Sequence, residues 1–116
     1  MPLDISFTHQ GDDRCIFHLR GRLDAHEAPT AYDRMIEHLG ERKRVVLDLA
    51  GLDYISSGGI SILIRLAHHL RQDGGDLHLA APQPFVRKVF DIVSFDAILR
   101  IFADLQEACD AFAPAS

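Results

Sequence analysis

The sequence predicts a single α/β domain in which a mixed β-sheet of four or five strands is backed by about four α-helices. The run 45–49 is almost wholly apolar and rich in β-branched residues, as expected of a strand covered on both faces. The stretch that follows, from Ile60 onward, carries apolar residues at helical spacing. A chain of 116 residues can form one sizeable hydrophobic core, so we expect one domain spanning residues 1–116.

The first third of the chain predicts a hairpin followed by a helix. Residues 3–8 alternate between apolar and polar side chains, and turn-forming residues follow at 10–13. Residues 15–19 read as a second strand, antiparallel to the first. One helical face comes next, ended by Gly40, and this helix would be the crossover to strand 45–49. The face consists of Ala28, Tyr32, Met35, Ile36 and Leu39.

The central helix is expected to run to about Gln72 and to bury one apolar stripe against the sheet. The stripe that the spacing defines consists of Ile60, Leu63, Ile64, Ala67 and Leu70. Ile62 and Leu66 lie beside this stripe, with Arg65 next to them. They are either the flank of the core or part of a surface that contacts a partner protein.

The last third of the chain predicts one more buried strand, two short helices and one apolar segment whose secondary structure the pattern does not define. Asp73–Gly75 ends the central helix, and residues 76–80 read as a strand. Residues 85–92 predict a helix with Phe85, Val89 and Ile92 inward and with Arg87 and Lys88 in solvent. The apolar segment 95–102 is a candidate edge strand. A short helix is expected after Asp104.

Composition restricts the classes of function. The formal net charge is −5 and the longest basic run is residues 42–44, which argues against direct binding of nucleic acid. Cys15 and Cys109 match neither a disulfide framework nor a zinc spacing, so we expect two buried, reduced thiols. No signal peptide and no apolar run of about 20 residues is visible, so we expect a cytoplasmic protein that does not use a membrane.

The stretch Ser56–Gly59 joins the buried strand to the central helix. Backbone N–H groups at a helix N-terminus are unpaired and the helix dipole is positive there, which favours a phosphate group. A nucleophilic serine is the weaker interpretation, because the sequence offers neither a G-x-S-x-G elbow nor a base and acid beside it. Gly58 and Gly59 lack the lysine and the spacing of a nucleotide-binding loop. On pattern alone, a serine that caps the helix is the leading interpretation.

No other cluster predicts catalysis or metal binding. His68 and His69 diverge by about 100° on a helix and cannot share one metal, so solvated histidines are the better interpretation. Asp24, Asp48 and Asp53 lie near strand ends, where aspartate usually forms turns or caps helices. We therefore predict no catalytic residue, no metal, no cofactor and no enzyme activity.

Several of these motifs together resemble the STAS family, the anti-sigma factor antagonists of bacterial partner switching, over nearly the whole chain. Gly21–Ala25 is similar to the family's early G-x-L-D-a segment, and residues 45–49 match its central v-v-l-D-l strand. Tyr54–Ile60 resembles the D-S-S-G-L signature. Two positions differ, because many members have aspartate at Ile55 and leucine or alanine at Gly59. The resemblance implies a STAS-like mixed sheet backed by helices.

In that family a serine kinase that is also the anti-sigma factor phosphorylates the first serine of the signature. The resemblance therefore implies that Ser56 is phosphorylated, with Ser57 as the less favoured site, and that a PP2C-type phosphatase removes the phosphate. Because Ile55 replaces aspartate, the alternative is a STAS interaction module that works unphosphorylated within a larger signalling complex. The partner-binding residues expected from the resemblance together with the helical spacing are Asp24, Tyr54, Ser56, Ser57, Gly58, Gly59, Ile62, Arg65 and Leu66.

Overall fold

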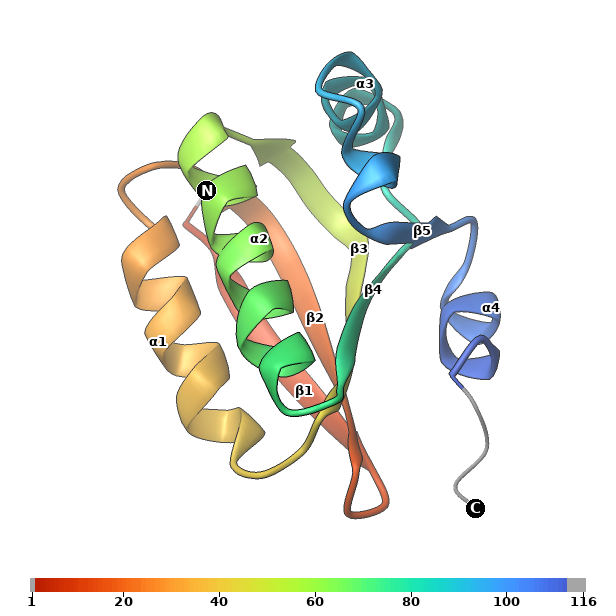
Figure 1. Ribbon diagram of the computed structural model, residues 1–116. Coiled ribbons are helices and arrows are strands. Elements are labelled where there is room, and N and C mark those ends of the chain that lie inside the picture. Colours follow the sequence, from red (N-terminus) through yellow and green to blue (C-terminus); the bar gives the residue numbers. More distant parts are fainter. Residues whose placement is uncertain (1, 113–116) are drawn as a thin grey trace.

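The computed structural model describes residues 2–112 and confirms the mixed sheet backed by helices (Figure 1). Within these residues one sheet has five strands in the order β1-β2-β3-β4-β5, and four α-helices accompany it. The elements are β1 (Asp4–Gln10), β2 (Arg14–Leu23), α1 (Ala28–Leu39), β3 (Arg44–Ile55), α2 (Ser57–Gln72), β4 (Asp76–Ala80), α3 (Pro84–Ile92), the 3-10 helix η1 (Phe95–Ala97), β5 (Arg100–Phe102) and α4 (Leu105–Asp110).

The connections follow the sequence pattern. β1 and β2 form the predicted antiparallel hairpin, and every other neighbouring pair in the sheet is parallel. The predicted crossover is α1, which returns the chain so that β3 lies parallel to β2. The apolar segment 95–102 forms η1 followed by β5, which is a three-residue edge strand beside β4.

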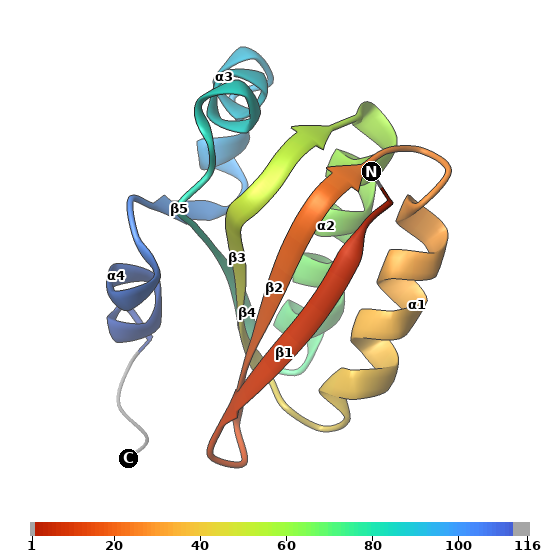
Figure 2. The same ribbon diagram turned by 180° about the vertical axis from the view of Figure 1, so that it is seen from behind.

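Two apolar layers lie on the two faces of β3. Its residues Val45, Leu47 and Leu49 belong to the main core, beneath α1 and α2 in the front of Figure 1. Val46 faces the other way and joins a smaller cluster with Ile16 of β2 and residues of α4. Figure 2 shows that α4 lies to one side and leaves β1 and much of β2 uncovered. The prediction that apolar side chains cover both faces of this strand is therefore confirmed at its first half.

Asp48 interrupts the apolar run of β3 because it points to the uncovered face. Its carboxylate oxygen Oδ2 lies 2.8 Å from Nδ1 of His18 on the neighbouring strand, and Oδ1 accepts a hydrogen bond from the backbone N–H of Ala50 at 3.1 Å. A carboxylate on this face keeps its polar partners and partial contact with water, so it does not carry the cost of burying an unpaired charge. The exception in the pattern thus marks the open side of the sheet.

The predicted side of α2 is wrong at several positions. Ile62 and Leu66 are buried in the main core, with 4% and 0% of their surface exposed. Ile64, which the spacing placed in the core, is 39% exposed, and Ile60 is only partly buried. The helix carries apolar residues around more than half of its circumference, so a second stripe was available. The buried stripe of α2 consists of Gly59, Ile62, Leu63, Leu66, Ala67 and Leu70.

The inward face of α3 was also predicted wrongly. Val86 and Phe90 are fully buried, whereas Phe85 is 50% and Ile92 is 75% exposed. Val89 is partly buried at the boundary between the two faces. Two pairs of apolar residues, Phe85 with Val89 and Val86 with Phe90, have the same four-residue spacing on this nine-residue helix. Periodicity alone does not show which pair faces the core.

The two cysteines agree with the expectation of buried thiols. Cys15 and Cys109 are both buried and unpaired. Burial raises the pKa of the Cys15 thiol to about 11, although the positive charge of Arg42 opposes this shift.

Among the described helices, none combines the length and the apolar character that crossing a bilayer requires.

His78 of β4 is a buried histidine that the sequence did not single out. It is 2% exposed, its Nδ1 donates a hydrogen bond to the carbonyl oxygen of Ala108 at 2.8 Å, and its ring stacks on Phe112 with 3.8 Å between centroids. Burial lowers the pKa of His78 below its ordinary value of 6.5, and the hydrogen bond to Ala108 offsets part of that shift. The neutral ring therefore helps to hold α4 against the sheet.

We predict that Ile62→Ala lowers the free energy of unfolding by about 2–5 kcal/mol, because it removes buried methyl groups and leaves a cavity. The matched change Ile64→Ala, two residues further along on the exposed side of the same helix, should cost less than about 1 kcal/mol. Urea unfolding of both variants measures the difference. Equal losses of stability would contradict the orientation of α2.

We predict that acid weakens the packing of α4. The folded protein binds the His78 proton less readily than the unfolded chain, so this contribution is complete above pH 6.5 and is lost as the pH falls from there toward the lowered pKa. His78→Gln, which does not titrate in this range, should lower stability near pH 7 but flatten its dependence below pH 6.5. Urea unfolding midpoints for both proteins across pH 5–8 test this expectation.

Candidate functional site

The turn between β3 and α2 presents two serines at the start of a 16-residue helix. Ser56 is the N-cap residue, and its Oγ accepts a hydrogen bond from the backbone N–H of Gly59 at 3.1 Å. The serine cap, which was the leading interpretation from pattern, is thus present. Ser56 is half-buried and Ser57 is exposed. A hydroxyl therefore lies at the positive end of the longest helix of the described chain.

The two glycines allow this turn to lie directly against the end of β2. A Cβ atom at Gly59 would lie 2.7 Å from the carbonyl oxygen of Leu23 and 2.8 Å from the side chain of Ile55. A Cβ atom at Gly58 would lie 2.9 Å from Cα of Ala25. Such distances exclude any side chain unless the backbone moves. The glycines therefore have a packing role that the sequence did not reveal.

The segment after β2 completes the same end of the molecule. The backbone N–H of Ser56 donates to the carbonyl oxygen of Leu23 at 3.0 Å, which ties the turn to the last residue of β2. Asp24 then accepts a hydrogen bond from the N–H of Glu27 through Oδ1 at 2.9 Å, and its carbonyl accepts from Ala28 at 3.0 Å. Asp24 thus fixes the turn that leads into α1, and this turn includes Ala25, which touches Gly58.

A row of stacked side chains extends from this turn toward α3. The guanidinium carbon of Arg22 lies 4.0 Å from the ring centroid of Tyr54, and the Tyr54 ring stacks on Phe85 with 5.8 Å between centroids. Arg22 and Tyr54 are register partners on β2 and β3. The row therefore connects the residue two positions before Ser56 with the first turn of α3.

The structure brings most of the predicted site residues together, but Ile62, Leu66 and Arg65 lie elsewhere. Asp24, Tyr54 and the Ser56–Gly59 stretch gather where β2 and β3 end. Ile62 and Leu66 do not belong to this surface, because both side chains are in the core. Arg65 is exposed, but its guanidinium lies over Tyr32 of α1, 4.2 Å from the ring centroid, on the side away from α3.

Sequence reasoning missed Arg22 and Phe85 as members of this surface. Arg22 was noticed only as part of a motif, and Phe85 was assigned to the core. One pattern could have indicated Phe85: the pair Val86 and Phe90 has the same four-residue spacing as Phe85 and Val89, so two inward faces were possible from the start.

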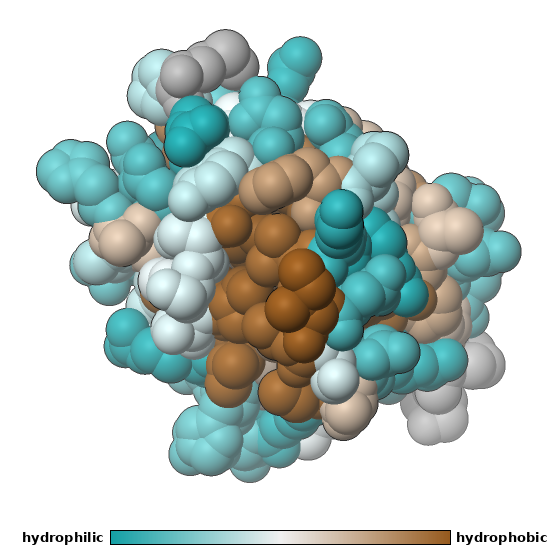
Figure 3. Space-filling model, turned by 90° about the horizontal axis from the view of Figure 1, so that it is seen from above, coloured by the Kyte–Doolittle hydropathy of each residue, from teal (hydrophilic) through white to brown (hydrophobic). Residues whose placement is uncertain are grey.

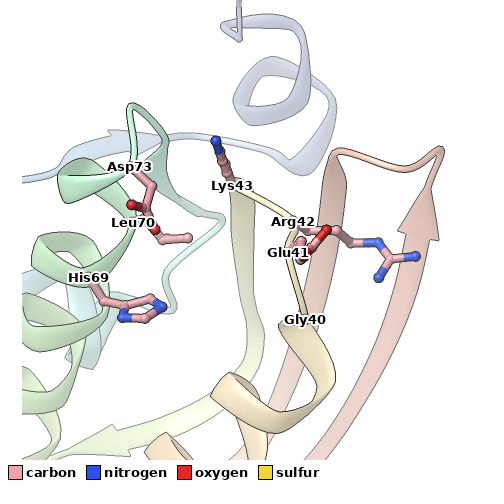
Figure 4. Close-up of a pocket in the computed structure, with 7 residues that line it drawn as sticks. All are labelled: Gly40, Glu41, Arg42, Lys43, His69, Leu70 and Asp73. Atoms are coloured by element: carbon pink, nitrogen blue, oxygen red, sulfur yellow. The ribbon is translucent and has the colours of Figure 1, made fainter.

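One hollow of the described surface lies at the other end of α2 from the Ser56 turn. Residues of the α1–β3 connection line it on one side, and His69, Leu70 and Asp73 line it on the other (Figure 4). Figure 4 shows Lys43 and Arg42 pointing in different directions, neither toward His69. Within the described part of the chain, no three His, Cys, Asp or Glu side chains gather in a way that could hold a metal ion.

The chain belongs to the STAS domain family, whose sequence profile matches residues 4–108. One relative is BtrV of Bordetella bronchiseptica, a proposed anti-sigma factor antagonist that is 47% identical over 73 residues. This match covers 63% of the chain and 62% of BtrV, so it includes less than two thirds of that protein. The anti-sigma F factor antagonist of Paenibacillus polymyxa is 26% identical over 104 residues, or 88% of each chain.

Solved structures show the same fold. The crystal structure of a Thermotoga maritima protein described as a candidate anti-sigma factor antagonist has a TM-score of 0.84 at 18% identity, over 91% of this chain and 92% of that one. Unphosphorylated SpoIIAA, an anti-sigma factor antagonist, has a TM-score of 0.78 at 21% identity, over 92% and 94%. SpoIIAA of Bacillus in its phosphorylated form has a TM-score of 0.70 at 20% identity, over 92% and 97%.

We predict that Gly59→Ala destabilises the domain. Alanine normally stabilises a helix relative to glycine by about 1 kcal/mol, but a Cβ atom here meets the Leu23 carbonyl at 2.7 Å. The sign of the change therefore tests the packing. Ser57→Ala at the exposed neighbouring position is the control and should leave the melting temperature nearly unchanged. A Gly59→Ala protein that melts higher than the parent would contradict the close contact.

Proposed function

We propose that this STAS domain is an anti-sigma factor antagonist that binds its partner through the Ser56 turn and is released when Ser56 is phosphorylated. The observation that carries the proposal is the position of Ser56, which is half-buried and caps the longest described helix at the end of the molecule where β2 and β3 end. Ser57, although exposed, has no part in the cap and is the less favoured acceptor of the phosphate.

A phosphate group on Ser56 is compatible with the folded domain. It carries a charge of about −1.5 to −2 and three acceptor oxygens, and the first turn of α2 offers unpaired N–H groups and a positive dipole. No aspartate or glutamate lies in that first turn to repel it. The same charge in the middle of a protein interface would have to lose its water, so it opposes binding without unfolding the protein.

The proposed partner surface consists of residues that the structure leaves accessible or uses to hold the turn. Its members are Asp24, Tyr54, Ser56, Ser57, Gly58 and Gly59, whereas Arg65 lies over Tyr32 of α1 and is left out. Asp24 and the two glycines act mainly by fixing the backbone around Ser56, because they make the contacts that join the turn to β2 and α1. Ile62 and Leu66 are excluded as buried residues.

The relatives give the proposal its partner. BtrV and the Paenibacillus polymyxa protein are described as antagonists of anti-sigma factors, and a phosphorylated form of SpoIIAA exists. We infer from the family resemblance that the partner of this chain is an anti-sigma factor that is also a serine kinase. A PP2C-type phosphatase would return the protein to the binding state. Action by binding requires no catalytic residue of this chain.

One observation favours a second candidate function, a STAS module that binds within a larger signalling complex without phosphorylation. Ile55 stands immediately before Ser56 and is 3% exposed, with its side chain packed where a Cβ of Gly59 would lie. A kinase that reads an acidic side chain before the serine finds none here. Intact mass and site mapping of the protein from its native cell separate the two functions, since only the switch requires a phosphate on Ser56.

We predict that Ser56→Asp weakens binding of the anti-sigma factor, while Ser56→Ala binds like the parent but accepts no phosphate. The alanine variant loses the cap, which costs about 0.5–2 kcal/mol, so both variants should stay folded. The measurement is calorimetric titration with the anti-sigma factor that co-purifies with the tagged parent protein, made with circular dichroism as a check of folding. Ser57→Ala is the control. A folded Ser56→Asp variant that binds as tightly as the parent would exclude regulation at this residue.

A further inference from the structure

An exposed apolar stripe runs along α3 beside the Ser56 turn. Phe85 and Ile92 lie seven positions apart on one side of the helix, with Val89 between them, over about 10 Å. Phe85 is 50%, Ile92 is 75% and the following residue Val93 is 47% exposed. We call the three exposed residues, Phe85, Ile92 and Val93, the α3 stripe, whereas Val89 is partly buried and packs against the core. An isolated exposed apolar residue is ordinary, but a contiguous group of large ones marks an interaction surface.

The exposure of the α3 stripe is fixed by the packing on the other side of the helix. Val86 and Phe90 are fully buried, and the Phe90 ring contacts the ring of buried Phe95 with 5.0 Å between centroids. At the start of the helix, Nε2 of Gln83 donates a hydrogen bond to the carbonyl oxygen of Ala50 at 2.7 Å. The helix cannot rotate to hide the stripe without exposing a phenylalanine and a valine of the core.

The stripe is continuous with the surface proposed to bind the anti-sigma factor. Tyr54 belongs to that surface and stacks on Phe85. Figure 3 looks down on the end of the molecule where α2 begins and α3 lies, and it shows an unbroken apolar patch at the centre, with hydrophilic residues around it. An apolar centre with a polar rim is the usual anatomy of a specific protein interface.

The size of a stable interface also requires more than the turn. A specific complex buries about 800 Å² on each partner, from about 20–30 residues a side. The Ser56 turn and its neighbours supply only a handful of side chains, two of its residues are glycines, and Gly59 is buried. Any partner seated on Ser56 therefore covers adjacent surface, and the α3 stripe is the adjacent apolar surface that Tyr54 touches.

The charges beside the stripe do not oppose an apolar partner. Arg87 lies on α3 with its Nε 3.2 Å from Oδ1 of Asp91, so these two charges compensate each other within the helix. Arg22 at the other margin rests on the Tyr54 ring. Lys88 is exposed three residues after Phe85 and four before Ile92, so it borders the stripe. The partner patch that matches this surface is thus apolar, with one cation at its margin.

We propose that the α3 stripe is the apolar anchor of the partner interface and inserts against an apolar patch of the same anti-sigma factor that contacts Ser56. This inference rests on the proposed function. It assigns two tasks to two neighbouring elements: the α3 stripe supplies much of the affinity, and the Ser56 turn supplies the response to phosphorylation. Interfaces commonly draw most of their binding energy from a few such buried apolar or aromatic anchors.

The test compares Ile92→Glu with Ile64→Glu. Both replace a solvent-exposed isoleucine of a helix by glutamate, but Ile64 lines a hollow together with Tyr32 of α1 on the other side of α2. The probe is the purified anti-sigma factor that co-purifies with the parent protein, titrated by calorimetry. We expect Ile92→Glu to weaken binding by about tenfold or more, with an unchanged melting temperature, and Ile64→Glu to bind within about twofold of the parent. Phe85→Ser should weaken binding in the same direction.

The outcomes separate this inference from the proposed function. Full affinity of Ile92→Glu and Phe85→Ser, together with weak binding of Ser56→Asp, would overturn the role of the stripe and leave the switch intact. If Ile92→Glu binds weakly but Ser56→Asp binds fully, the stripe is supported and the phosphoswitch fails. Light scattering gives the third comparison: a parent dimer that Ile92→Glu converts to monomer without loss of partner affinity would assign the stripe to a second copy of this chain and overturn the inference. If the parent binds no anti-sigma factor, both proposals fail.

Discussion

The close contact between the first turn of α2 and the end of β2 is the constraint on which the candidate site depends. Gly59 leaves no room for a side chain beside the Leu23 carbonyl, and Ser56 is hydrogen-bonded both to that carbonyl and to the N–H of Gly59. A loop held this firmly presents its serine in one geometry. The rigidity matters for a switch, because a phosphate can then change the interface without first having to order a flexible segment.

The same contact connects the site to the core of the domain. β2 and β3 run parallel and end together, so residues after each strand meet at one edge of the sheet. α2 leaves that edge and buries Ile62, Leu63 and Leu66 against the strands. The helix that Ser56 caps is therefore held by the main hydrophobic core, so a charge added at its N-terminus would leave the fold intact.

The surface around Ser56 combines two kinds of chemistry. The turn offers hydroxyls and backbone N–H groups that respond to charge, whereas Phe85 and Ile92 of α3 offer apolar area that does not. The Tyr54 ring, stacked between Arg22 and Phe85, joins the two parts. A regulator of this kind must bind its partner well and still be released by one modification. Both needs are met when affinity and control reside in different residues.

The sequence by itself determined the order of strands and helices, the hairpin, the serine cap and the STAS resemblance, since these depend on local periodicity, turn chemistry and motifs. It placed Ser56–Gly59 correctly at the start of α2. Only the tertiary structure decided which of two apolar stripes is buried on α2 and α3, and therefore that Ile62 and Leu66 are core residues while Phe85 and Ile92 face solvent. The physical reason is that a helix apolar on more than one side can bury either side, and the neighbouring strands and helices, which lie far away in sequence, select one of them.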